Sequence, residues 1–252
     1  MAHCGARRSG SGQTAMPPRI GIVAALEREV AAVAKKLAKR SDGPEGLTIF
    51  ENTSVRLVCG GMGAKQAANA ANWLIASYKP EAVMSIGFAG ALVADYSVGD
   101  VITPGTVIDA NSGERFLVGG GDSSLVSSAG VMAEAGKRQL AAQFAAQAVD
   151  MEAATVARVA QQNGVPFMAV KAISDPMDFA MPPMDRFVSE AGKFRTLPFL
   201  AYIAARPSSW PVVAQLNANA HRASSQLCCW LENQISRDFQ DVMSTIGAKT
   251  RS

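Results

Sequence analysis

The chain has 252 residues, 48% of them hydrophobic, with 24 Lys and Arg against 21 Asp and Glu. This length is enough to bury one sizeable core, and an α/β fold of this size is commonly one domain. No basic stripe with interleaved aromatic residues occurs, which argues against a nucleic-acid partner, and no apolar run reaches the roughly 18 residues of a membrane span, which argues against stable membrane insertion.

The four cysteines and two histidines exclude two common kinds of site. No C-x-x-C pair occurs, and Cys228 and Cys229 are adjacent. This inventory makes neither a convincing zinc site nor a disulfide framework, and it favours a reducing cytoplasm as the compartment. We therefore expect no metal and no cofactor, and we expect carboxylates to carry the acid–base chemistry.

Residues 1–18 are rich in Gly, Ser and Arg and lack the apolar segment of a secretory signal, so a disordered extension is expected there. After them, short apolar runs alternate with amphipathic segments, which predicts strands alternating with helices. In chain order we expect strand Arg19–Ala25, helix Glu27–Arg40, strands Leu47–Thr53 and Val55–Cys59, helix Ala64–Tyr78, strands Ala82–Ile86, Val98–Ile108 and Leu125–Ser127, helices Gly136–Phe144 and Ala153–Asn163, strand Val165–Ile173, and helices Met184–Ala205 and Val212–Ile235. The pattern predicts a single-domain, three-layer α/β/α fold with a central mixed, largely parallel sheet.

Three marked segments directly follow expected strands: Ala25–Glu29, Gly87–Ala91 and Ser174-Asp175. Ligands of open α/β sheets bind beyond the carboxyl ends of the strands, so these segments are candidates for one site. The glycine-rich segment 60–63 precedes a helix but lacks both the P-loop lysine and the dinucleotide-binding glycine spacing. Taken alone it favours a tight turn over an anion-binding turn.

Four segments, in this order, resemble the nucleoside phosphorylase and nucleosidase superfamily. They are Ile20–Val30, Gly87-Phe88-Ala89-Gly90 with Val98–Val101 shortly after, Val149–Ala154 and Val170–Asp175. The first is similar to the opening strand and helix of the methylthioadenosine/S-adenosylhomocysteine nucleosidases. The resemblance covers the chain from about Ile20 to Asp178. It implies a nucleoside phosphorylase-like catalytic domain over residues 19–240, followed by a C-terminal tail over 241–252.

The resemblance implies cleavage of the N-ribosidic bond of a purine nucleoside. Carried over position by position, it makes Asp175 the acid that protonates the purine and Glu29 the group that activates the attacking water. Glu152 would accept hydrogen bonds from ribose hydroxyls, and Met151 would pack against the sugar. The further substrate contacts that we expect are Phe88, Ala89, Gly90, Val149, Phe167, Lys171 and Ser174.

These residue types suit the reaction on chemical grounds as well. A purine anion is a poor leaving group, so a carboxylic acid in a partly desolvated pocket lowers the barrier by protonating it. The sugar becomes oxocarbenium-like, and a nearby carboxylate stabilises the positive charge that develops. A carboxylate at the position of Glu29 repels a phosphate dianion but accepts a proton from water, which favours hydrolysis over phosphorolysis of the nucleoside.

Two residues depart from the pattern of the methylthioadenosine branch. Phe88 stands where those nucleosidases carry serine, and Lys171 stands where they carry arginine; lysine supplies charge without the planar fork. Downstream, Ser174–Pro182 and Ala205-Arg206-Pro207 are more similar to the hopanoid-associated phosphorylase-like branch, whose implied reaction removes adenine from an adenosyl-lipid.

Two further expectations concern the class of protein and its assembly. A non-catalytic nucleoside-binding regulatory protein on the same fold is the alternative from another class, because a fold does not guarantee an activity. The superfamily resemblance also implies a homodimer or larger oligomer, in which a neighbour's loop completes the site.

Overall fold

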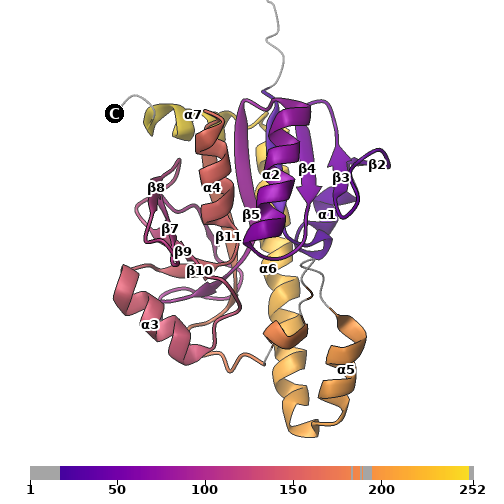
Figure 1. Ribbon diagram of the computed structural model, residues 1–252, viewed down its shortest axis with the longest axis vertical. Helices are drawn as coiled ribbons and strands as arrows, with labels where there is room; N and C mark the ends of the chain where they lie inside the picture. Colours follow the sequence, from indigo (N-terminus) through magenta and orange to yellow (C-terminus); the bar gives the residue numbers. More distant parts are fainter. Residues whose placement is uncertain (1–17, 183, 188, 190–194, 250–252) are drawn as a thin grey trace, which may run out of the picture.

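The computed structural model describes residues 18–182, 184–187, 189 and 195–249 (Figure 1). The disordered extension expected over residues 1–18 lies outside the described residues, apart from Pro18. The described strands form one mixed sheet. Its strands, in order of pairing, are β2 (Ala38–Arg40), β3 (Thr48–Glu51), β4 (Val55–Cys59), β1 (Ile20–Ala24), β5 (Ala82–Ala91), β10 (Ala148–Asp150), β9 (Ser124–Ser127), β7 (Thr106–Asp109) and β8 (Arg115–Leu117).

The long strand β5 organises the sheet. Its first half pairs in parallel with β1, and its end pairs antiparallel with β10. On its other side it pairs in parallel with β11 (Phe167–Asp175), which also pairs antiparallel with the short strand β6 (Val101–Ile102). β4 continues the parallel set beyond β1. The parallel strands therefore end at the same edge of the sheet, as the predicted fold requires.

Helices cover both faces of the sheet. On one face, α2 (Ala64–Tyr78) and α4 (Ala153–Gln162) pack against each other and the strands; on the other lies the long helix α6 (Trp210–Ser236), with α1 (Ala31–Ala34) and α7 (Gln240–Lys249) against it (Figure 1). Alternation along β1 explains the division, because Val23 joins the first core while Ile20 and Ile22 join the second. The predicted α/β fold with a mixed central sheet is confirmed.

The remaining helical elements lie around the carboxyl edge of the sheet or next to it. Helix α3 precedes β10, and α5 forms a hairpin with the start of α6 that projects from the body of the protein (Figure 1). Their bounds, with those of the three short 3-10 helices, are α3 (Glu134–Phe144), α5 (Thr196–Ala204), η1 (Glu27–Glu29), η2 (Met184–Phe187) and η3 (Pro207–Ser209).

Several predicted elements differ from the structure. The helix expected over Glu27–Arg40 is wrong, because η1 and the single turn of α1 are followed by β2. Residues 38–40 pair antiparallel with β3, and this pairing overrides the helical spacing of their neighbours. The strand expected at Val98–Ile108 divides into β6 and β7, and the helix expected at Met184–Ala205 divides into η2 and α5. Residues 240–249, expected to lie largely in a tail, form α7 with Val242 and Ile246 buried.

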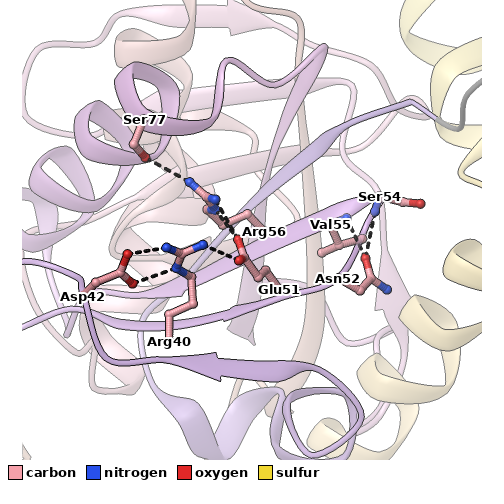
Figure 2. A network of polar contacts seen from close by, with 8 residues as sticks. All are labelled: Arg40, Asp42, Glu51, Asn52, Ser54, Val55, Arg56 and Ser77. Carbon is pink, nitrogen blue, oxygen red and sulfur yellow. Dashed lines mark hydrogen bonds and ion pairs between the residues drawn. The ribbon is translucent and has the colours of Figure 1, made fainter.

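A network of charged side chains supports the β2–β3–β4 edge (Figure 2). Glu51 accepts hydrogen bonds from Arg40 and from Arg56, whose guanidinium also lies over the ring of Tyr78, 4.6 Å from its centroid. Arg40 also donates hydrogen bonds to both carboxylate oxygens of Asp42. Burial raises the pKa of Glu51, but the hydrogen bonds from Arg40 and Arg56 outweigh it and hold that pKa below the ordinary value. The edge strand β2 is therefore attached to β4 through one carboxylate.

Replacing Glu51 should lower the free energy of unfolding more than replacing the exposed Asp42. We expect Glu51→Ala to lower the free energy of unfolding by about 1–3 kcal/mol, the usual contribution of hydrogen bonds to charged groups. Because the pKa of Glu51 is lowered from 4.5 in the folded protein, this contribution is present above about pH 4.5 and is lost as the pH falls below it. Urea unfolding at pH 7 and pH 3 measures both effects. Asp42→Ala is the matched control, and an equal effect of the two variants at pH 7 would contradict the assignment.

Candidate active site

A cavity of about 240 Å³ opens at the carboxyl edge of the sheet. Segments that follow β1, β4, β9 and β10, together with the ends of β5 and β11, form its floor. The rest of its lining comes mainly from α3, α5 and α6. The site therefore lies where parallel strands place it, beyond their carboxyl ends.

Most of the residues expected at the site from the sequence meet in this cavity. Those that line it are Glu29, Phe88, Ala89, Gly90, Val149, Met151, Glu152, Ser174 and Asp175. Two expected residues, Phe167 and Lys171, do not line it. Segments separated by more than a hundred residues in the chain thus form one surface, and the sequence segments that carry the resemblance supply its floor.

Glu29 is held at the end of η1 with its carboxylate buried. The backbone N–H of Leu26 donates to its Oε2 at 3.2 Å, and from α6 the Ser224 hydroxyl donates to its carbonyl oxygen at 3.2 Å. Gly87 allows this placement, because a Cβ there would lie 3.0 Å from Oε2 of Glu29. Burial raises the pKa of Glu29, against the lowering effects of the Leu26 N–H and the Lys171 charge. A buried carboxylate whose pKa is raised is a stronger base than an exposed one, which suits it to accept a proton.

Glu152 stands at the start of α4 and is fixed by the glycine-rich turn. The backbone N–H of Gly63, a residue with φ of +92°, donates to Oε1 of Glu152 at 2.7 Å. The turn over residues 60–63 thus binds a carboxylate of the protein itself. Burial and, after it, the neighbouring Asp150 charge raise the pKa of Glu152 to about 7, against the opposing effects of the Lys171 charge and the Gly63 N–H.

Lys171 lies beneath the carboxylates, away from the cavity surface. It is 1% exposed, forms an ion pair with Asp150 at 2.9 Å, and donates to the Ser85 hydroxyl at 3.0 Å. Burial lowers the pKa of Lys171, but the charges of Asp150 and Glu152 outweigh it and keep the lysine an ammonium. The expected direct contact between Lys171 and substrate is therefore not supported by its position, and its role is to set the charge of the floor.

Asp150, which sequence reasoning did not select, completes this buried arrangement. Its Oδ1 accepts a hydrogen bond from the Ser127 hydroxyl at 2.5 Å, and its Oδ2 accepts one from the Ala153 backbone N–H at 2.9 Å. It thereby joins β9, β10 and the first turn of α4. Its place between Val149 and Met151, in a segment that carries the family resemblance, is the sequence signal that could have identified it.

Asp175 ends β11 with both carboxylate oxygens engaged. The Ser174 hydroxyl donates to Oδ1 at 2.6 Å, and the ammonium of Lys137, from α3, donates to Oδ2. Lys137 also donates to the carbonyl oxygen of Pro176 at 2.7 Å and is 1% exposed. Gly90 leaves room for this pair, since a Cβ there would lie 2.8 Å from Oδ2 of Asp175. No sequence signal distinguished Lys137, because a lysine on an amphipathic helix is usually a surface residue.

Phe167 lies far from this group. It begins β11, eight residues before Asp175, and a strand of that length spans roughly 26 Å. Phe167 lines a separate cavity, together with Val165, Pro166 and Ile246. This placement contradicts the expected base contact at Phe167.

Part of the cavity wall is apolar. This apolar wall consists of Phe88 from β5, Met181, Phe199 from α5, and Val213 and Leu216 from α6. Ala223, Leu227 and Leu231, farther along α6, are buried in the core. One helix therefore supplies both the core and a wall of the cavity.

Within residues 18–182, 184–187, 189 and 195–249, no group of three or more His, Cys, Asp and Glu side chains is arranged to hold a metal ion. None of the helices in the described part of the chain is long and apolar enough to cross a membrane.

The raised pKa of Glu152 predicts a stabilising substitution. Glu152→Gln keeps an oxygen that accepts from Gly63 but removes the buried charge. In the wild type, the neutral carboxyl stabilises the fold fully below about pH 4.5, and this contribution is lost as the pH rises to about 7. A shift of that size corresponds to up to about 3 kcal/mol. We therefore expect the ligand-free variant to be more stable than the wild type at pH 8, with little difference at pH 4.

Urea unfolding at the two pH values measures this difference. The exposed Glu27→Gln serves as the control for loss of a surface charge. A Glu152→Gln protein that is less stable than the wild type at pH 8 would contradict the environment assigned to this carboxylate.

Comparison with known proteins agrees with the fold and with the recognised segments. Over 214 residues the chain is 27% identical to a 5'-methylthioadenosine/S-adenosylhomocysteine nucleosidase of Staphylococcus carnosus, covering 69% of this chain and 94% of the relative. It is 29% identical to the enzyme of the same name from Actinobacillus succinogenes, covering 64% of this chain and 86% of the relative.

Solved structures share the fold at lower identity. The apo 5'-methylthioadenosine nucleosidase of Arabidopsis thaliana superposes with a TM-score of 0.69 at 17% identity, covering 89% of this chain and 97% of that one. The futalosine hydrolase of Helicobacter pylori superposes with a TM-score of 0.65 at 16% identity, covering 88% and 99%. The family model described as the phosphorylase superfamily matches residues 19–127 and 121–196, and the chain belongs to that superfamily.

Proposed function

We propose that this protein is a nucleosidase that hydrolyses the N-ribosidic bond of an adenosine-type purine nucleoside. The observation that carries the proposal is the placement of Glu29, Glu152 and Asp175 around one cavity, each held by a separate contact. The relatives named as methylthioadenosine/S-adenosylhomocysteine nucleosidases support the same reaction class. Neither a metal nor a cofactor is required by these groups.

The carboxylates are spaced to act on different parts of one ligand. Glu29 lies against Gly87 and Asp175 against Gly90, three residues farther along β5, which corresponds to roughly 10 Å of extended chain. Asp175 would face the base and deliver a proton to N7 as the C1'–N9 bond breaks and its electron pair moves to the purine. Glu29 would take a proton from the water that attacks C1'. Glu152, with one oxygen bonded to Gly63, would accept hydrogen bonds from the ribose hydroxyls.

The charges around the cavity favour water over phosphate as the nucleophile. Two of the lysines nearby are already paired, Lys137 with Asp175 and Lys171 with Asp150. A phosphate dianion at the sugar would meet the carboxylates of Glu29 and Glu152 without those cations to offset the repulsion. Hydrolysis, with a carboxylate as the general base, fits this arrangement better than phosphorolysis.

Release of the free base tests the reaction class. We expect purified protein to release adenine from adenosine derivatives at the same rate with and without phosphate, with free ribose derivatives as the other product. Chromatography of the products separates the outcomes. Formation of a sugar 1-phosphate that depends on added phosphate would replace hydrolysis by phosphorolysis. No base release under either condition, together with measurable nucleoside binding, would support the regulatory alternative.

Substitution of the two catalytic carboxylates tests their roles. We expect Asp175→Asn and Glu29→Gln each to reduce kcat by about 10²–10⁴-fold, the usual contribution of a general acid or base. Nucleoside binding, measured by calorimetry, should remain, because each amide preserves the shape of the side chain it replaces. Near-normal turnover in Asp175→Asn would show that another group supplies the proton.

The apolar wall favours a nucleoside with an apolar 5' substituent, and it supports an adenosyl-lipid as the second candidate substrate. Phe88, Phe199, Val213 and Leu216 provide a surface for such a substituent. We expect kcat/KM to rise with the length of a 5'-alkylthio chain on adenosine. If 5'-methylthioadenosine is turned over as well as the long-chain derivatives, and adenosylhopane in membranes is ignored, the lipid substrate is excluded.

We also propose that the protein works as a cytoplasmic homodimer. The free Cys59, Cys228 and Cys229 are consistent with a reducing compartment. The dimer follows the superfamily resemblance. Light scattering of the purified protein measures its mass, for which we expect twice the 26.3 kDa of one chain.

A further inference from the structure

Lys137 is buried beside the acid of the proposed reaction. A lysine that is 1% exposed is unfavourable unless a partner compensates its charge, and Asp175, itself 5% exposed, supplies that partner. The ammonium comes from α3, whereas the carboxylate ends β11, so the contact joins two elements that both line the cavity. The same ammonium also donates a hydrogen bond, at 2.7 Å, to the carbonyl oxygen of Pro176, the residue that follows β11.

This pairing leaves neither carboxylate oxygen of Asp175 without a hydrogen-bond donor before substrate binds. Both oxygens of Asp175 accept hydrogen bonds, from the Ser174 hydroxyl and from the Lys137 ammonium. A carboxylate that accepts at both oxygens beside an ammonium is ionised, and an ionised carboxylate has no proton to donate. A group bonded to Asp175 must therefore replace the proton that the purine takes. Of these two partners, a lysine ammonium is a far stronger acid than a serine hydroxyl.

We propose that Lys137 is the source of the proton that Asp175 delivers to the leaving purine, an inference that rests on the proposed nucleosidase function. As the C1'–N9 bond breaks and its electron pair moves to the purine, a proton passes from Nζ of Lys137 to the Asp175 carboxylate, and Asp175 passes that proton on to N7. The attacking water passes its proton to Glu29. Lys137 ends as a neutral amine, Asp175 as a carboxylate, and Glu29 as a carboxylic acid.

The charge of the buried site stays constant through this sequence. Before the reaction, the three side chains carry +1, −1 and −1; afterwards only Asp175 is charged, so their sum is unchanged. The step therefore adds no net charge to the buried site, and the Asp175 carboxylate that remains at the end still accepts hydrogen bonds from Ser174 and from the Lys137 amine. The proton held by Glu29 leaves to solvent, and Lys137 regains one from solvent when the products depart.

A purely structural role for Lys137 makes a different prediction. If the ion pair only attached α3 to β11, its loss would reduce kcat by a similar factor for every substrate of the cavity. A proton source matters only for leaving groups that need a proton. Comparing two leaving groups in the same variant therefore separates the two roles.

The test uses Lys137→Met, which keeps the length of the side chain but has no ammonium, and Lys137→Arg, which keeps a cation that does not release its proton. The substrates are 5'-methylthioadenosine and 4-nitrophenyl β-D-ribofuranoside, whose nitrophenolate leaves without protonation. We expect both variants to lose about 100-fold in kcat on the purine substrate, the scale of general acid catalysis, and to keep the nitrophenyl rate close to that of the wild type. Arg138→Met, an exposed neighbour on α3, is the matched control.

The outcomes separate this inference from the function beneath it. A wild-type protein that releases no base from purine nucleosides overturns the nucleosidase proposal, and the role of Lys137 falls with it. Wild-type base release combined with an equal loss on both substrates in Lys137→Met, or with full purine turnover in Lys137→Arg, overturns the role of Lys137 alone.

A rescue experiment gives a second readout. In Lys137→Ala, added ethylamine should restore purine turnover in proportion to its concentration, because a small ammonium ion enters the space left beside Asp175. Absence of rescue in a variant whose circular dichroism and unfolding midpoint match the wild type would count against Lys137 as the proton source.

Discussion

The buried ion pair between Lys171 and Asp150 is the interaction on which the cavity floor depends. Either charge alone, almost fully buried at the sheet edge, would be strongly unfavourable, and each compensates the other. The same ammonium opposes the effect of burial on the pKa values of Glu29 and Glu152. Without it, three carboxylates would share a poorly solvated space, and protonation of more than one of them would be favoured. The lysine thus keeps acidic residues available as bases.

A second lysine serves the other end of the cavity. Lys137 is a buried cation that compensates the charge of the buried Asp175, just as Lys171 compensates the charge of Asp150. The two pairs come from different elements, so the part of the site that we assign to the sugar and the part that we assign to the base have separate sources of positive charge. In the proposed reaction, this separation would let the carboxylates have opposite tasks, one accepting a proton and the other delivering one.

The sequence predicts the regular parts of this architecture and the floor of the site. Helix α2 occupies the predicted residues 64–78, because its alanine-rich periodicity is strong and local. The floor is predictable because parallel strands end at one edge, so residues after those strands meet there. The contacts that depend on packing across elements are not predictable in this way. Lys137 has the pattern of a surface lysine until α3 is placed beside β11, and residues 38–40 become a strand only by pairing with β3.

The two surfaces of the cavity belong to different parts of the chain, and this division bears on substrate choice. The floor, with Glu29, Glu152 and Asp175, lies within the residues that match the superfamily model. The apolar wall includes Phe199 and Leu216, which lie beyond the last matched residue at position 196. In the proposed function, the carboxylates of the floor would act at the glycosidic bond, and the wall from α5 and α6 would contact the group attached to the sugar. The two surfaces would then determine the reaction and the substrate separately, since a fold does not by itself fix an activity.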